Sequence, residues 1–223
     1  QGVSSAASDV YKRQVVLDSP QNVQALQFMV DMIQRDRITP PSVVTFKEDE
    51  SLHEFQSGSA VFLRSWPYVW GLIQQPGQPL LGRVGMVPMP HSDTAGARSA
   101  ACLGGWNLMI SHYSQHPQEA WRLVSFLTSA DEQRKRFIAA TQLATRVEPY
   151  HDADVLEAHP QAADLLRVLE LARPRPVTPY YSKLSDILQI QLHRAISGEV
   201  TAEEALHLAA QQIRAIPGIE AAR

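Results

Sequence analysis

Apolar positions recur every three or four residues over much of the chain, a spacing that predicts amphipathic helices. Signals that begin and end helices support this prediction. Ser19-Pro20 suits a helix start, whereas Gly58 and Gly198 suit helix ends. Ser129 and Thr201 each stand three residues before a glutamate, as in a capping box. The predicted helices begin at residues 19, 49, 117, 129, 165, 182 and 201.

Three short apolar runs predict β-strands at residues 60–63, 84–87 and 106–111, the first of them buried. Residues 173–179 contain three prolines and must be extended, because each proline disfavours a helical conformation at the residue before it. The fold class is therefore α/β, rich in helices. Since three short strands cannot cover all the amphipathic helices, we expect some helices to pack on strands outside this chain.

The first fourteen residues, QGVSSAASDVYKRQ, follow neither pattern and lack the apolar stretch of a signal peptide. We interpret residues 1–14 as a non-native adapter or vector scar, with a disordered native tail as the alternative. The chain also lacks an initiator methionine. We therefore expect a fragment that has lost its natural N-terminus and any export signal.

The composition excludes several classes of protein. The chain has 223 residues, 44% of them hydrophobic, and a net charge of −3, so it lacks the basic surplus of a nucleic-acid binder. The single cysteine, Cys102, excludes an internal disulfide and a cysteine-based zinc cluster, and it leaves the compartment open. No apolar run reaches the roughly 18 residues of a membrane span.

No sequence motif for catalysis, a cofactor or a metal is present. Phosphate-binding, dinucleotide-binding, zinc-protease and serine-hydrolase motifs are all missing. His151, Asp152 and Asp154 are interpreted as the polar start of a helix rather than as metal ligands. We expect no catalytic residue, no cofactor and no metal.

Aromatic residues next to irregular backbone are the main candidates for function. Trp66, Tyr68 and Trp70 follow one predicted strand, and Trp106 follows Gly104-Gly105. An indole ring can stack on the apolar face of a sugar while its N–H donates to a hydroxyl. The two glycines let the backbone come close to a ligand.

Arg175 is a further candidate for ligand binding. Arg175 supplies several donors that could bind neighbouring hydroxyls or a carboxylate. The alternative for Trp66 and Trp106 is a place in the core, which the spacing alone leaves open. Trp121, inside an amphipathic helix, is assigned to the core.

These residues carry a resemblance. The run from Phe55 to Phe62, followed by Trp66-Pro67-Tyr68-Val69-Trp70, resembles the F-x-x-G-x-A-x-x…W-P-Y stretch of family-1 extracellular solute-binding proteins. These proteins are the substrate-binding components of bacterial ABC sugar importers, of the maltose- and trehalose-binding type. Further matching segments follow in the family's order at residues 104–110, 120–129, 172–181, 197–199 and 203–206.

The resemblance implies a periplasmic-binding-protein type II fold, truncated to the C-terminal half. Residues 15–88 and 151–223 would form the C-terminal lobe, and residues 89–150 would contribute to the N-terminal lobe. The implied sugar-binding residues are Trp66, Tyr68, Gly104, Gly105, Trp106 and Arg175. Arg173 is the less favoured choice for the arginine.

The implied function is capture of a di- or oligosaccharide between two lobes, followed by delivery to the importer's transmembrane subunits. The protein would be a monomer and not an enzyme, without a nucleic-acid partner. It would be periplasmic or extracellular, and it would meet the membrane only through the importer or a lost lipid anchor. Two alternatives stay open: a fragment of a glycoside hydrolase, which needs two facing carboxylates, and a purely structural helical module.

Overall fold

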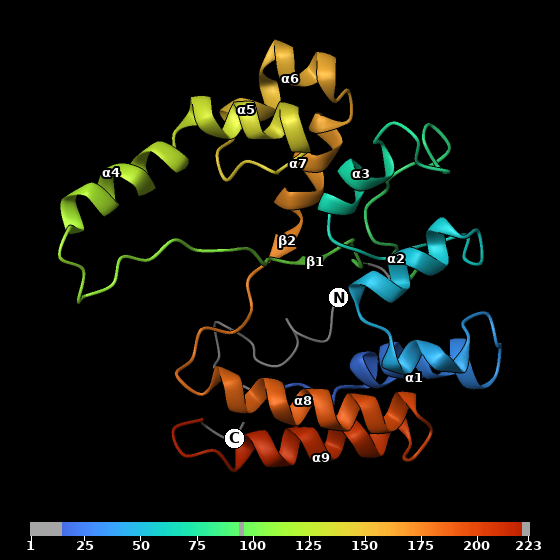
Figure 1. Ribbon diagram of the computed structural model, residues 1–223. Coiled ribbons are helices and arrows are strands. Elements are labelled where there is room, and N and C mark those ends of the chain that lie inside the picture. The colour runs from blue at the N-terminus through green and yellow to red at the C-terminus, as the bar shows by residue number, and fades with distance from the viewer. Residues whose placement is uncertain (1–14, 94–95, 220–223) are drawn as a thin grey trace. The chain divides into compact units, whose positions relative to one another are not determined.

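The computed structural model describes residues 15–93 and 96–219. The chain divides into two compact units (Figure 1). Of the described residues, unit 1 comprises 15–51, 90–93, 96–103 and 173–219, and unit 2 comprises Leu52–Met89 and Gly104–Ala172. The segment 1–14, interpreted above as a scar, lies outside the described residues.

Unit 1 is built on three helices: α1 (Pro20–Gln34), α8 (Tyr181–Ile196) and α9 (Ala202–Arg214). The helices α8 and α9 lie side by side (Figure 1), and both also contact α1. Their core is made of small and branched side chains without solvent exposure, including Leu26, Ala205, Leu206 and Ile213. Several of these buried residues are alanines on α9, and small side chains at a helix interface let neighbouring helices approach closely. A 3-10 helix, η1 (Pro41–Thr45), follows α1.

An ion pair connects Asp18, just before α1, with Arg214 at the end of α9. The Arg214 guanidinium donates to both carboxylate oxygens of Asp18, at 2.9 and 2.7 Å, and to the carbonyl oxygen of Val15 at 2.9 Å. These hydrogen bonds lower the pKa of Asp18 below its ordinary value, outweighing the opposite effect of partial burial.

Unit 2 begins within α2 (Glu48–Gln56) and continues with the helices α3 (Tyr68–Ile73), α4 (Pro117–Leu127), α5 (Ala130–Ala140), η2 (Glu148–His151), α6 (Ala153–Ala158) and α7 (Ala162–Glu170). Its larger core lies among α5, α6, α7 and η2 and centres on Phe137 and Tyr150. The two rings meet edge to face at 5.1 Å between centroids, and the Tyr150 hydroxyl donates to the Ala144 carbonyl oxygen at 2.8 Å. A smaller core joins α2 to α3 through Leu52, Val69 and Ile73.

The helix signals of the sequence are largely confirmed. Ser19 caps α1, and Thr201 with Glu204 forms the reciprocal capping box of α9. Ser129 caps α5, while Glu132 pairs with Arg136 at 2.9 Å. Asp152 caps α6 through hydrogen bonds from two backbone N–H groups, as expected for a polar helix start. The described residues hold no group of three or more His, Cys, Asp or Glu side chains suited to a metal.

The three predicted strands are wrong. Residues 60–63, 84–87 and 106–111 lie outside any strand, and Val61 and Phe62 are 83% and 91% exposed instead of buried. The described strands are only β1 (Ala101–Cys102) and β2 (Ala172–Arg173), joined near the Leu103 N–H, which donates to the Arg173 carbonyl oxygen at 2.8 Å. An apolar run favours extended backbone, but a strand also needs a neighbouring backbone for its hydrogen bonds, which the described residues do not supply here.

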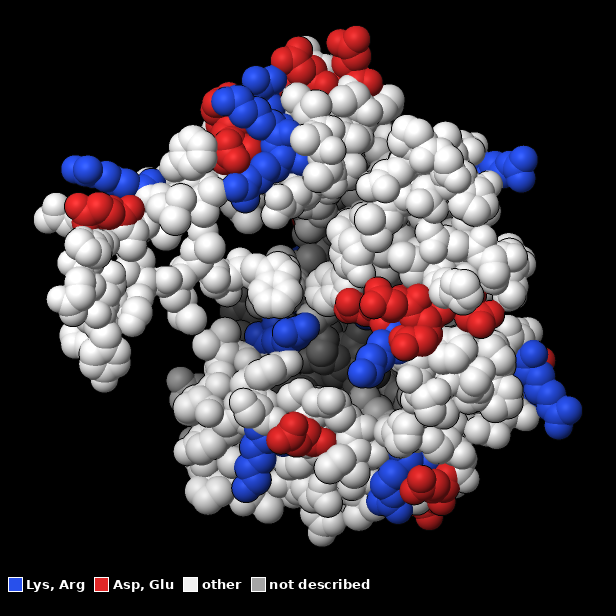
Figure 2. Space-filling view, viewed as in Figure 1, with Lys and Arg blue, Asp and Glu red and all other residues white. Residues whose placement is uncertain are grey.

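Trp121 was also wrongly assigned to the core. It is 62% exposed, no residue of α4 is buried, and Leu123 and Phe126 on the same helix are each 57% exposed. Figure 1 shows α4 and the segment that leads into it extending away from α5, and Figure 2 shows most of this surface without charge. Helical spacing predicts an apolar face but not what covers it. Within the described ranges, no helix is long and apolar enough for a bilayer crossing.

Candidate functional site

The backbone of Trp66 is fixed by the start of α3. The Trp66 carbonyl oxygen accepts from the Val69 N–H at 3.2 Å, and the Pro67 carbonyl oxygen accepts from the Trp70 N–H at 3.1 Å. Pro67 has a helical φ of −59°, close to the value that its ring imposes. Val69 and Ile73 anchor α3 in the smaller core of unit 2, and Trp66, directly before this helix, is half-buried.

The structure brings Trp66 and Gly104 together, although they are far apart in the sequence. A Cβ atom placed on Gly104 would lie 2.5 Å from Cη2 and 2.8 Å from Cζ3 of the Trp66 ring. The far edge of the indole therefore rests against the backbone at Gly104. The sequence reasoning assigned both residues to one site but did not identify this contact.

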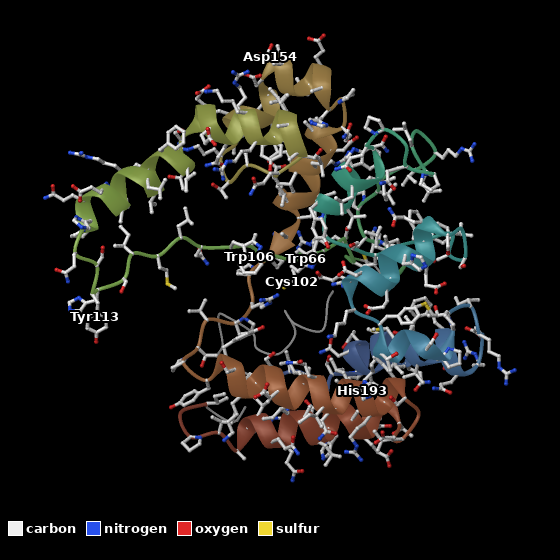
Figure 3. All side chains as sticks on the ribbon, viewed as in Figure 1. Trp66, Cys102, Trp106, Tyr113, Asp154 and His193 are labelled. Atoms are coloured by element: carbon white, nitrogen blue, oxygen red, sulfur yellow. The ribbon has the colours of Figure 1, made fainter. Side chains whose placement is uncertain are left out.

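Trp106 lies in the same neighbourhood of unit 2. It follows Gly104 by two residues, so their Cα atoms are at most about 7 Å apart. Its side chain is fully exposed, which contradicts the alternative of a core position within the described part of the chain. Figure 3 shows the Trp106 and Trp66 side chains close to each other in this view. Trp66 therefore contacts Gly104, and Trp106 follows that glycine by two residues.

The two remaining aromatic residues of α3 differ in exposure. Tyr68 is 41% exposed, which suits a supporting contact to a ligand. Trp70 is half-buried, and its buried Nε1 atom has no hydrogen-bond partner among the described residues. Trp70 therefore contributes mainly to the packing of α3.

Arg175 belongs to unit 1, in the extended proline-rich segment predicted from the sequence. Its exposed side chain interacts with the sulfur of Cys102, which is the main reason that the pKa of the guanidinium is raised above its ordinary value. Arg175 is therefore cationic throughout the physiological range. Arg173, the less favoured choice, lies in β2 and is also exposed.

The side chains gathered in unit 2 are suited to non-covalent binding of a ligand. Indole faces offer apolar contact and an N–H donor, which match the two kinds of surface on a pyranose. The exposed backbone at Gly104 and Gly105 carries polar groups near the rings.

Comparison with known proteins gives this geometry a context. The family model described as bacterial extracellular solute-binding protein matches residues 2–134 of the chain. A probable ABC transporter-binding protein of Deinococcus radiodurans is 33% identical over 207 residues, covering 92% of this chain and 48% of that protein.

Solved structures show the same fold. Maltose-bound MalE3 of T. maritima is 40% identical, with a TM-score of 0.86 over 94% of this chain and 54% of MalE3. The GacH receptor of Streptomyces glaucescens, solved unliganded and with acarbose, is 22% identical, with a TM-score of 0.81 over 93% of this chain and 52% of the receptor. This chain thus spans about half the length of these relatives.

These findings confirm the type II periplasmic-binding-protein fold that the motifs predicted. The matching family is one of solute-binding proteins, and the Deinococcus relative is a probable ABC transporter-binding protein. Because the family model covers more than half of the sequence, this chain belongs to the family of bacterial extracellular solute-binding proteins.

Proposed function

We propose that the protein binds a di- or oligosaccharide and delivers it to the transmembrane subunits of an ABC importer. The observation that carries this proposal is the half-buried Trp66 against Gly104, with the fully exposed Trp106 two residues further on, in unit 2. The maltose complex of the 40% identical MalE3 supports an α-linked glucose oligomer as the first sugar to test.

We propose Trp66 and Trp106 as the stacking surfaces of the site, with Tyr68 as a neighbouring contact. A sugar ring covers an indole with its C–H groups, and the water released from both surfaces favours binding. Gly104 and Gly105 are proposed to border the same surface. Arg175 is proposed, by its match to the family motif, as a separate donor to sugar hydroxyls.

Capture and delivery would follow from a shift between open and closed states of the complete protein. A ligand favours the state in which it makes more contacts, so a sugar held by both lobes stabilises closure. The closed form would then dock on the importer. We infer a monomer that works in the periplasm or outside the cell, with or without a lipid anchor.

Calorimetric titration of the complete gene product with maltose and maltotriose tests the proposal. Trp66→Ala or Trp106→Ala should weaken binding by about 1–3 kcal/mol, because each removes a buried aromatic contact to the ligand. Phe28→Ala on α1 is the control, since Phe28 is an exposed aromatic residue outside the proposed site, 63% accessible. Unchanged affinity in both tryptophan variants would remove these residues from the site.

The same protein distinguishes the alternatives. A binding protein should gain thermal stability with sugar and leave the sugar intact. Release of reducing ends from the oligosaccharide would favour the glycoside-hydrolase alternative. No change in tryptophan fluorescence or melting temperature with any sugar would favour a purely structural module.

A further inference from the structure

We propose that Gly104 is a positioning residue for Trp66. The missing side chain at Gly104 lets the indole ring lie against the backbone, and this contact sets the orientation in which the ring meets the sugar. The inference rests on the proposed function, because it concerns how the proposed stacking surface is held. It differs from the expectation that Gly104 serves to bring the backbone close to the ligand.

The contact leaves no room for a side chain. Carbon atoms in favourable contact are about 3.5–4.0 Å apart. A Cβ atom on Gly104 would approach the Trp66 ring to 2.5 Å at Cη2 and 2.8 Å at Cζ3. Even alanine would therefore push the outer edge of the indole away from its position.

The other end of Trp66 cannot move to relieve this clash. Its carbonyl oxygen is bonded to the Val69 N–H at 3.2 Å, and Val69 is only 5% exposed in the core beneath α3. Pro67 restricts the backbone directly after Trp66. We expect the indole to rotate about its side-chain bonds, because the clash falls on the far end of the side chain, and this rotation changes the face presented to solvent.

Space alone, and not backbone conformation, requires glycine at this position. Gly58 and Gly198 have φ values of 82° and 81°, which L-residues rarely adopt, but Gly104 and Gly105 do not have positive φ. A Cβ atom on Gly105 would meet no atom within 4 Å. Gly105→Ala is thus a matched control for the contact, because it adds the same methyl group one residue further along the chain without meeting the Trp66 ring.

The test compares Gly104→Ala with Gly105→Ala in the complete gene product. We expect the indole N–H resonance of Trp66, assigned by its loss in Trp66→Ala, to shift in ligand-free Gly104→Ala and to stay in place in Gly105→Ala. Maltotriose affinity should fall about threefold to tenfold in Gly104→Ala, the range that a disturbed aromatic contact gives. Gly105→Ala serves as the control for the Trp66 resonance alone, because a Cβ atom there meets no atom within 4 Å; its affinity is not part of the comparison, since Gly105 itself borders the proposed site.

A double variant isolates the contact. In the Trp66→Ala background, Gly104→Ala should cause no further loss of affinity, because the two residues act as one unit. If Gly104→Ala alone does not fold, the double variant Trp66→Ala/Gly104→Ala should fold, because the clash with the indole is gone. A double variant that also fails to fold would overturn the proposal.

The two proposals can fail separately. An unshifted Trp66 indole resonance in Gly104→Ala, or equal losses of affinity with and without Trp66, would overturn the role of Gly104. A wild-type protein that binds no sugar would overturn the proposed function, while the indole resonance would still decide whether Gly104 positions Trp66.

Discussion

At the scale of single residues, the tryptophans of unit 2 differ in how far their side chains are exposed to solvent. Trp70 is half-buried with its Nε1 atom buried, whereas Trp106 is fully exposed. Trp66 is intermediate, because one edge of its ring rests on Gly104. Exposure of a large apolar ring costs solvation free energy, and a ligand that covers it recovers this energy.

Tyr150 gives a prediction about stability at this scale. Tyr150→Phe should lower the free energy of unfolding by about 1–2 kcal/mol, because the buried Ala144 carbonyl oxygen loses its donor. Tyr113→Phe should change stability little, since Tyr113 is 86% exposed. Urea denaturation of both variants measures the difference. Equal stability of Tyr150→Phe and the wild type would show that this hydrogen bond contributes nothing.

The same tyrosine affects stability in alkali. Burial raises the pKa of Tyr150 to about 12, from an ordinary value of 10. The unfolded state therefore ionises first, and the stability that Tyr150 contributes is complete below pH 10 and is lost as the pH rises toward 12. Tyr150→Phe should lose less stability than the wild type over this pH range, as denaturation curves at pH 9 and pH 11 would measure. A parallel loss in both proteins would contradict this origin of the pH dependence.

At the scale of elements, unit 1 depends on the ion pair between Asp18 and Arg214. Asp18→Asn should lower the free energy of unfolding by about 1–2 kcal/mol at neutral pH, because a partly buried, charge-assisted pair of hydrogen bonds is weakened. Asp36→Asn is the control: Asp36 pairs on the surface with Arg35, their side chains are 41% and 67% exposed, and such pairs contribute little.

The contribution of this ion pair to the free energy of unfolding also depends on pH. The lowered pKa of Asp18 means that its contribution is complete above the ordinary value of 3.8 and disappears as the pH falls through the lower value of the folded state. The difference in stability between the wild type and Asp18→Asn should therefore shrink in acid. Denaturation at pH 7 and at pH 2.5 measures it, and a difference that stays constant would contradict the assigned role.

The elements also show where sequence reasoning succeeds. Helix starts at Ser19 and Thr201, and helix ends at Gly58 and Gly198, could be predicted because capping groups and positive φ act within a few residues. The strand prediction at 60–63 failed because pairing depends on backbone far away in the sequence. The assignment of Trp121 to the core was wrong for a related reason: helical spacing identifies an apolar face, but it does not show whether another element packs on that face.

At the scale of the whole molecule, the candidate site could be predicted in part. Short motifs in a fixed order predicted the family, which the comparisons confirm, whereas Trp66, Gly104 and Trp106 stay predicted site residues. The contact between Trp66 and Gly104 could not be predicted, since it depends on how two distant segments pack in unit 2. The chain spans about half of MalE3, so the activity of the complete protein stays a proposal.

The most direct measurement of the central claim is a crystal structure of the complete gene product with maltotriose. The account predicts a pyranose ring stacked on the indole of Trp66 or Trp106, at the distance of about 3.5–4.0 Å that carbon contacts favour. Maltotriose bound without contact to either tryptophan, or crystals grown at saturating sugar without any bound, would contradict it.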